Sequence, residues 1–405
     1  MAMKSVSRFV IIFLILSVIF LYIVVSYLNS AHVGYPKIMK TDTSNYNGNN
    51  NKGEHTVSGL QTIQELSPHL QQLVGENDNP LRMHKKLLDK SQQIVLAVVA
   101  CGDRLSETLV MLKSAILFTQ KPLSFIIVAD DPLIPSFKEK LNEWKSAANN
   151  SFTYRVLPIT FPLQENVDEW RKLFKPCASQ RLFLPTVLSD IDSLLYVDTD
   201  TLFLGPLEDV WRHFDLMNST QMAALTPEHE DPNTGWYNRF AKHPYYGPLG
   251  VNSGVMLMNL TRMRTFSWTN YVVPIYKEYK LKITWGDQDI INIIFHFHPD
   301  KLYIYPCRYN YRPDHCMYMS VCKSAESEGV AVLHGSRGSF HAEKQPAFRA
   351  IYRAMEEYQL GIDSYVNLFL TIRNYLELTT SSNCGKIQHI FTKAMQQFIP
   401  DSYGR

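Results

Sequence analysis

Three short, mostly apolar segments constrain the fold of this chain more than any other feature of its sequence. They read IVLAVVA at 94–100, FIIVADD at 125–131 and SLLYV at 193–197. Strands without polar alternation are typical of a parallel sheet that is covered on both faces. Between the first two lies SETLVMLKSAILF, whose apolar residues share one face of a helix that we expect Ser106 to cap. Strands and helices that alternate in this way predict an α/β fold with βαβ crossovers.

Ligands of an open α/β sheet bind beyond the carboxyl ends of its strands, which directs attention to the residues after Val99, Val128 and Val197. Asp198 and Asp200 follow the last of these strands in the sequence YVDTD. At this spacing both carboxylates can point to one face and share a divalent ion. A solvated surface loop is the alternative, but two unpaired charges between the apolar segments LLYV and LFL would be costly. We therefore expect a bound metal here.

A second polar feature follows a strand that ends at His334. The sequence VAVLHGSRG places the imidazole beside a glycine-flanked loop whose backbone amides could approach a phosphate. A buried core histidine is the alternative. Two carboxylates and one imidazole, completed by diphosphate oxygens, suit Mn²⁺ better than Zn²⁺ or Ca²⁺. Such an ion would neutralise departing UDP, which is the main requirement of glycosyl transfer from a UDP-sugar.

The N-terminal part of the chain predicts a membrane anchor. Residues 9–28 are uncharged, and a helix of that length, rising about 1.5 Å per residue, covers the roughly 30 Å hydrocarbon core. Lys4 and Arg8 precede it, so residues 1–8 are expected in the cytosol and the rest in a lumen, as in a single-pass type II protein. A cleaved signal peptide is the alternative, although the apolar run is long for one. Residues 29–91 are polar and predict a lumenal stem, and we expect the protein in the Golgi or endoplasmic reticulum membrane.

A lumenal location makes the six cysteines available for disulfides, because the secretory lumen is oxidising. Their pairing does not follow from spacing alone. Cys316 and Cys322 frame a short loop that suits a local bridge better than a zinc site, with a reduced, buried Cys316 as the alternative. Sequons at Asn149, Asn218 and Asn259 could carry glycans, although Asn259 lies in an apolar strand pattern.

Composition bounds the partners and the domains. With 40 Lys and Arg against 38 Asp and Glu, the net charge of +2 gives no support to a nucleic-acid partner. Residues 92–345 contain the strand signals and predict one sheet domain, whose core the 45% of hydrophobic residues can supply. Residues 346–405 contain amphipathic runs such as AFRAIYRAMEEY and predict a C-terminal helical extension packed on that domain.

Beyond these patterns, the chain resembles glycosyltransferase family eight and, within it, the glucoside xylosyltransferases. The similarity runs from about 94 to 348 and includes AVVACGDR, KLFKPCASQRLFLP, DSLLYVDTDTLFL, LTPEHE, YGPLGVNSGVMLMNL, ITWGDQDIINIIF, NYRPDHCMY and VLHGSRG. For residues 92–345 it implies a GT-A fold, an open mixed sheet with helices on both faces. It also implies UDP-xylose as the donor and transfer with retention, in an alpha linkage, onto O-linked glucose of EGF-like repeats.

The resemblance also assigns roles to single residues. It implies that a metal is bound by Asp198, Asp200 and His334. It also implies that Asp200 contacts the ribose of the donor. It implies that the catalytic residues, which face the donor sugar and the acceptor, are Asp287, Gln288 and Asp289. It implies that the uridine pocket of the donor is lined by Ala100, Cys101 and Gly102. It implies further donor contacts from Arg181, Asn252, Ser253, Gly254, Gly335, Arg337 and Gly338.

One departure concerns the diphosphate. Members of the family commonly carry a lysine after the HxxG motif, and this lysine binds the diphosphate. This chain has Phe340 and His341 there instead. Arg337 or His341 could substitute, and Arg337 is better suited because its planar fork matches phosphate oxygens and stays charged. On the acceptor side, Trp236 and Tyr237 could form a wall that stacks on a sugar, with buried core aromatics as the alternative.

The residues are compatible with alternatives for the mechanism, the donor and the class of protein. The reaction could use front-face attack or a double displacement through Gln288 or Asp289. The donor could also be another UDP-sugar of a glucosyl- or galactosyltransferase, because a xylose pocket differs by one CH₂OH group. A non-catalytic lumenal binding protein would be expected to lack the metal ligands, and all of these are present.

Overall fold

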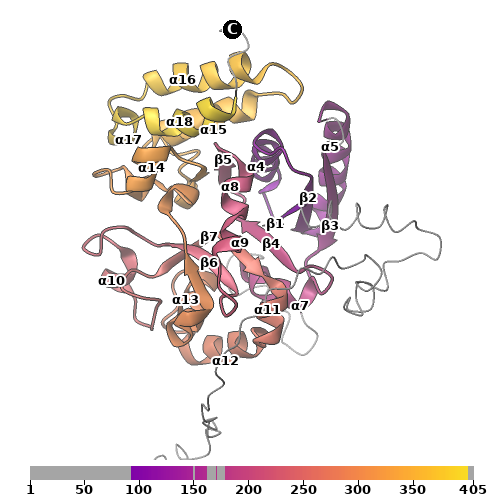
Figure 1. Ribbon diagram of the computed structural model, residues 1–405, viewed down its shortest axis with the longest axis vertical. Helices are drawn as coiled ribbons and strands as arrows, with labels where there is room; N and C mark the ends of the chain where they lie inside the picture. The colour runs from indigo at the N-terminus through magenta and orange to yellow at the C-terminus, as the bar shows by residue number, and fades with distance from the viewer. Residues whose placement is uncertain (1–92, 149–150, 162–169, 171–177, 400–405) are drawn as a thin grey trace, which may run out of the picture. The chain divides into compact units, whose positions relative to one another are not determined.

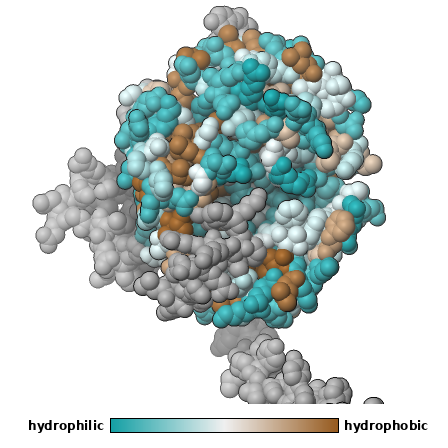
Figure 2. Space-filling model, turned by 180° about the vertical axis from the view of Figure 1, so that it is seen from behind, coloured by the Kyte–Doolittle hydropathy of each residue, from teal (hydrophilic) through white to brown (hydrophobic). Residues whose placement is uncertain are grey.

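The computed structural model describes residues 93–148, 151–161, 170 and 178–399. The predicted cytosolic tail, membrane anchor and stem, as well as Asn149, lie outside these residues. Within them, each helix is too short or too polar to cross a membrane. The described part is a mixed sheet with helices packed against it (Figure 1), and its face in Figure 2 is mostly hydrophilic, with hydrophobic residues in small separate patches.

The main sheet of the described residues has seven strands in the order β3-β2-β1-β4-β7-β6-β8. β1 to β4 are parallel, and β7 runs antiparallel between β4 and β6. These strands are β1 (Ile94–Ala100), β2 (Leu123–Ala129), β3 (Phe152–Pro158), β4 (Ser193–Val197), β6 (Ala223–Pro227), β7 (Val251–Asn259) and β8 (Leu302–Ile304). A separate antiparallel pair consists of β5 (Thr201–Phe203) and β9 (Val332–His334).

The sheet is buried on both faces, as its apolar strands predicted. Side chains alternate along β1, so that Leu96 and Val98 enter one core and Ala97 and Val99 enter the other. The first core is covered by α4 (Leu105–Leu117), α5 (Ile134–Ala147) and α8 (Leu207–Trp211). The second is covered by α7 (Leu184–Val187), α11 (Leu260–Thr265), α12 (Thr269–Tyr279) and α13 (Asp287–Phe297). Burial of each aliphatic side chain contributes roughly 1.5–3 kcal/mol, which explains why both faces are covered.

The predicted serine cap of α4 is wrong. The helix begins at Leu105 with Arg104 at the N-cap position, and no side chain caps it. Ser106 therefore lies inside the first turn, where it cannot accept from the amides that follow a cap. The strand and helix themselves agree with the prediction, because their apolar pattern determines them more strongly than one capping residue.

The C-terminal helices pack on the first core, beside α4 (Figure 1). They are α15 (Pro346–Glu357), α16 (Leu370–Glu377), α17 (Asn383–Lys386) and α18 (His389–Phe398). Other short helices lie earlier in the chain, namely α9 (His213–Leu216), α10 (Trp236–Phe240) and α14 (Lys323–Glu328). The Lys113 ammonium of α4 donates to the carbonyls of Glu356 and Tyr358, at 2.9 and 2.5 Å. The rings of Phe118 and Phe398 pack at a tilt, with centroids 5.5 Å apart. These contacts join the helices after Phe340 to the sheet.

The predicted local bridge between Cys316 and Cys322 is wrong. Cys322 is joined to Cys307, and Cys316 is joined to Cys384. Cys101 is also disulfide-bonded. The two cysteines of the short loop face different elements, so the second bridge ties this loop to α17 across 68 residues of sequence. Closing a loop of that size removes conformational entropy from the unfolded chain.

Two of the sequons lie on described residues and differ in accessibility. Asn218 is exposed, and its side-chain oxygen accepts from the backbone amides of Thr220 and Gln221. Asn259 ends β7 half-buried and caps α11 by accepting from the Arg262 amide at 2.8 Å. Asn218 is therefore the more accessible of the two sequons.

Candidate active site

Asp198 and Asp200 occupy the turn that leads from β4 into β5. The Asp198 amide donates to the carbonyl of Gly254 in β7 at 2.8 Å, which anchors the start of the turn to the main sheet. β5 pairs with β9 so that Thr201 lies opposite His334. Backbone hydrogen bonds therefore hold the acid pair and the histidine next to each other, although they are distant in sequence.

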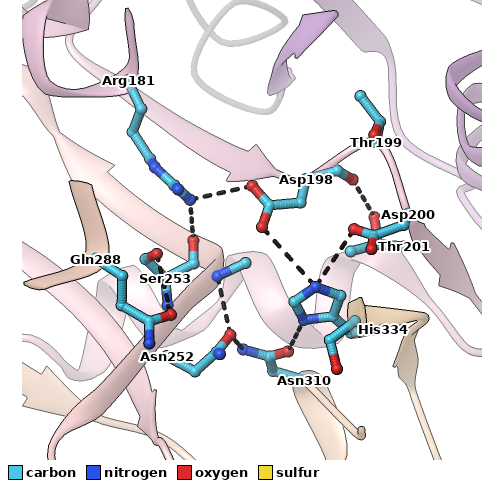
Figure 3. Close-up of polar contacts among 12 residues, drawn as sticks. Arg181, Asp198, Thr199, Asp200, Thr201, Asn252, Ser253, Gln288, Asn310 and His334 are labelled. Atoms are coloured by element: carbon cyan, nitrogen blue, oxygen red, sulfur yellow. Dashed lines mark hydrogen bonds and ion pairs between the residues drawn. The ribbon is translucent and has the colours of Figure 1, made fainter. Parts of the chain in front are cut away.

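The three predicted metal ligands lie together (Figure 3). One ligand atom from each of Asp198, Asp200 and His334 lies within 4.8 Å of the others. His334 Nε2 is 3.3 Å from Asp200 Oδ1 and 3.8 Å from Asp198 Oδ2. Burial alone would raise the pKa of Asp200, but the neighbouring imidazole keeps that pKa below its usual value. Two carboxylates and an imidazole that converge in this way fit a divalent metal ion.

Asn310 orients the histidine, a role that we did not predict. Its side-chain oxygen lies 2.8 Å from His334 Nδ1, which leaves Nε2 directed at the acids. Asn310 Nδ2 donates to Asn252 Oδ1 at 2.8 Å, and the same oxygen accepts from the Gly254 amide at 3.0 Å. The predicted donor residues Asn252 and Gly254 thus belong to the network that supports the predicted metal ligands. Figure 3 shows Asn252 and Asn310 in this network.

Arg181 links the acid pair to the N-terminus of α13. Its Nε and Nη2 donate to Asp287 Oδ2 at 2.7 and 2.5 Å. Its Nη1 donates to Asp198 Oδ1 at 3.2 Å and to the carbonyl of Ser253. Arg181 and Asp287 are both buried, and the guanidinium lies 4.4 Å from the centre of the Tyr196 ring. Arg181 lines the pocket, but its N–H groups donate mainly to other residues of the site. It therefore fixes the positions of these residues.

The chain matches a known family over the residues that form the carboxylate–imidazole cluster. The sequence pattern of the family described as Glycosyl transferase family 8 matches residues 95–334, which include the acid pair and His334. The chain belongs to this family. The predicted family is thereby confirmed, and so is the expected mixed α/β sheet of GT-A type with helices on both faces.

Similar family 8 proteins include two named glucoside xylosyltransferases. Human Glucoside xylosyltransferase 1 is 53% identical over 325 residues, which are 78% of this chain and 73% of the human protein. Mouse Glucoside xylosyltransferase 2 is 51% identical over 321 residues, which are 76% of this chain and 72% of the mouse protein. The resemblance to glucoside xylosyltransferases is confirmed, and the chain is a glycosyltransferase enzyme.

The three predicted catalytic residues of this family 8 enzyme differ in their access to the pocket. Gln288 and Asp287 line it, the latter in its ion pair with Arg181. Asp289 is fully buried and does not line it. Asp289 Oδ1 accepts from the Tyr237 hydroxyl at 2.8 Å, and Oδ2 accepts from two backbone amides just before α13 at 2.7 and 2.8 Å. These contacts organise the start of the helix.

The predicted uridine edge lies at the carboxyl end of β1. Ala100 is fully buried, and Cys101 is almost buried with its sulfur in a disulfide. Gly102 has a positive φ of 63°, and its amide donates to Asp130 Oδ2 at 2.9 Å. Only a residue without a side chain adopts this conformation easily, so Gly102 allows the turn that brings the ends of β1 and β2 together.

Both candidates for the diphosphate clamp are already paired with carboxylates. Arg337 Nη2 lies 2.5 Å from Asp314 Oδ2, and His341 Nε2 lies 3.0 Å from Glu107 Oε2. Arg337 lines the pocket, whereas His341 does not. Phe340 is buried, and its ring packs so closely on Gly335 that a Cβ there would lie 2.5 Å from it. Nearby Gly338 has a positive φ of 74° in the same loop.

The predicted acceptor wall needs a correction. Tyr237 is only 1% exposed, so its ring belongs to the core and cannot stack on a sugar. Trp236 is half-buried and does not line the pocket. Trp285, which we did not predict, is 41% exposed, lines the pocket, and has its ring centroid 5.6 Å from that of Trp236.

Further pocket residues lie outside the predicted set. They are Glu228, Trp285, Arg312, Asp314 and Ser336. Burial raises the pKa of Glu228, although the nearby Arg312 guanidinium opposes this. The rule that polar residues at the carboxyl ends of strands form the site would have found Glu228, because it directly follows β6. It was missed because the strand itself was not predicted.

Proposed function

We propose that this enzyme transfers xylose from UDP-xylose to a glucoside. The observation that carries the proposal is the 53% identity over 325 residues to human Glucoside xylosyltransferase 1. A cluster of two carboxylates and an imidazole is consistent with a nucleoside-diphosphate donor, whose oxygens would complete the coordination of a metal ion.

The cofactor that we propose is Mn²⁺, held by Asp198, Asp200 and His334. When bound, it would supply positive charge to the departing diphosphate. The protein's own contribution is to hold these ligands in place. Asn310 fixes the imidazole through Nδ1, and Arg181 fixes the Asp198 carboxylate. Such supporting contacts commonly change metal affinity by about 10- to 100-fold when they are removed.

The route that we propose is front-face attack with retention. The bond from C1 to the UDP oxygen breaks, the acceptor oxygen bonds to C1 on the same face, and the departing phosphate oxygen takes the hydroxyl proton. The burial of Asp289 supports this route, because a double displacement needs a carboxylate that reaches C1. Gln288 lines the pocket but offers only a weakly nucleophilic amide. Isolation of a xylosyl-enzyme adduct would overturn front-face attack.

The acceptor that we propose is glucose O-linked to EGF-like repeats, and the location is the lumenal side of the Golgi or endoplasmic reticulum membrane, with residues 9–28 as the anchor. The resemblance stated for the sequence supports the acceptor, and the uncharged N-terminal segment supports the location. A glucosylated EGF-like domain should accept xylose, and the same domain without glucose should not.

A donor panel tests the central proposal. The purified full chain would be assayed with Mn²⁺, p-nitrophenyl β-D-glucoside and, in turn, UDP-xylose, UDP-glucose and UDP-galactose. We expect kcat/KM to be at least about tenfold higher for UDP-xylose, because one CH₂OH group changes the barrier by about 1–3 kcal/mol. NMR of the product should show an α-xyloside. A preference for either hexose donor would overturn the proposed donor, and an absence of UDP release from all three would overturn catalysis.

A further inference from the structure

One wall of the pocket carries chemistry that the metal site does not use. Its side chains are Trp285, Glu228, Arg312 and Asp314. They form one connected patch, because the Trp236 amide donates to Glu228 Oε2 at 3.2 Å and the Trp236 ring contacts that of Trp285. Arg312 donates to the backbone carbonyl of Glu228, which joins the two ends of the patch.

Trp285 provides an apolar platform at this wall. Its side chain stays 41% exposed while it lines the pocket, whereas Asp287, two residues further on, is buried. An indole face of this kind matches the apolar CH face of a pyranose, and β-glucosides present such a face because their hydroxyls are equatorial. The sugar hydroxyls, in turn, need hydrogen-bond acceptors, and carboxylates can serve as these.

Glu228 and Asp314 are those carboxylates. Among the described residues, the Glu228 side chain accepts only from the Trp236 amide, so Oε1 is left for a ligand. Asp314 Oδ2 is paired with Arg337, whose side chain is half exposed. Arg312 is 1% exposed, and its charge balances the two acids so that they can remain in the pocket wall. An aromatic platform beside hydrogen-bonding carboxylates is a combination that suits an uncharged sugar.

We infer that Trp285, Glu228 and Asp314 form the subsite for the acceptor sugar, with the indole stacked on the pyranose and the carboxylates accepting from its hydroxyls. This inference rests on the proposed function for the identity of the sugar as a glucoside. It assigns the acceptor to a wall that the predicted pair Trp236 and Tyr237 does not form.

Charge separates this subsite from that of the donor. The two acids of this wall balance Arg312 and Arg337, so the wall has no excess positive charge that would attract a diphosphate. A neutral glycoside needs no such charge. The donor is then left with the wall formed by the metal ligands, Ser253 and Gln288. The exposed position of Trp285 at the pocket also suits an acceptor that is attached to a larger molecule.

Variants of the full chain test the inference through two separate readouts. The first is UDP release from UDP-xylose without acceptor, and the second is the KM for p-nitrophenyl β-D-glucoside. We expect Trp285→Ala and Glu228→Gln each to raise the acceptor KM about tenfold and to leave the donor KM and UDP release within about twofold. Trp285→Phe should recover most of the loss, because it keeps an aromatic face.

Matched controls come from the same elements. Phe297→Ala removes an exposed aromatic side chain at the other end of α13, and Glu230→Gln changes a carboxylate two residues from Glu228 that does not line the pocket. Both should leave the acceptor KM unchanged. An unchanged acceptor KM in Trp285→Ala, or an equal rise in its donor KM, would overturn the acceptor assignment.

A binding measurement separates this inference from the proposed function. Saturation-transfer NMR with methyl β-D-glucoside detects contact with the protein without turnover. The wild-type chain should give a signal that Trp285→Ala loses and Phe297→Ala keeps. If the wild type binds the glucoside in this way but releases no UDP from UDP-xylose, the donor proposal fails and the sugar subsite stands. If it transfers xylose but Trp285→Ala keeps the signal, the subsite fails alone.

Discussion

The close approach of Gly254 to the histidine ring makes Gly254→Ala the sharpest test of the metal site. A Cβ at this position would lie 2.1 Å from His334 Cε1 and 2.6 Å from Nδ1. Because ordinary carbon contacts are about 3.5 Å or longer, the ring must move by more than about 1 Å. The Gly254 carbonyl also accepts from the Asp198 amide, so the backbone of β7 is not free to move instead.

That movement acts directly on metal binding. It would break the 2.8 Å contact between His334 Nδ1 and Asn310 and shift Nε2 away from Asp200 Oδ1, now 3.3 Å away. Misorientation of a ligating histidine typically lowers metal affinity by about 10- to 100-fold. Crowding of the core should also lower the free energy of unfolding by about 1–3 kcal/mol. The two effects can be measured separately.

Calorimetric titration with Mn²⁺ and thermal unfolding would be carried out on the same samples. Gly205→Ala is the matched control, because its Cβ would lie 3.1 Å from the Ala394 Cβ, a tight contact away from the pocket. It should lower stability without lowering Mn²⁺ affinity. In the background of His334→Ala, Gly254→Ala should cause no further loss of affinity, because there is no ring to displace. Full Mn²⁺ affinity in Gly254→Ala alone would refute the reasoning.

Three further predictions follow from buried polar groups. Asn310→Ala should lower Mn²⁺ affinity about 10- to 100-fold in calorimetry, because it frees the imidazole of His334; an unchanged affinity would exclude the orienting role. Arg181→Met should lower the free energy of unfolding by about 3–5 kcal/mol, since it leaves the buried Asp287 unpaired, and the additional change Asp287→Leu should recover part of it. Burial lowers the pKa of His213 to about 4 in the folded protein, whereas an ordinary histidine has a pKa near 6.5. Between these pH values the His213 side chain is protonated in the unfolded chain but not in the folded one, so a falling pH favours unfolding. Denaturant unfolding should show stability falling across that window, and less so in His213→Phe; equal slopes would contradict this.

The elements around the site could be predicted because their signals are local. β1, β2 and β4 are apolar at nearly every position, which is the consequence of burial on both faces. Asp198 and Asp200 follow the end of one strand and His334 ends another, so each was assigned correctly to a strand end that lines the pocket. The family resemblance assigned donor contacts to further residues, including residues without a pattern of their own, and these assignments stay predictions.

The remainder depends on contacts between distant parts of the chain. Asp289 and Tyr237 have the chemistry of site residues, but their mutual hydrogen bond buries both. Cys316 is joined to Cys384 instead of the nearer Cys322, because the fold brings α17 to the loop. No local pattern could show either partner, since spacing along the chain does not report which surfaces meet.

By itself, the sequence determined that β1, β2, β4 and β9 become strands, where the polar ends of these strands lie, and that two acids and an imidazole are available for a metal. Only the tertiary structure decided that the pairing of β5 with β9 brings His334 to the acids, and that Trp285 and Glu228 share a pocket wall while Tyr237 does not. The physical reason is that periodicity reports burial of a segment against its surroundings, whereas the partners in a site depend on strand order and register, which are set by the packing of the whole sheet.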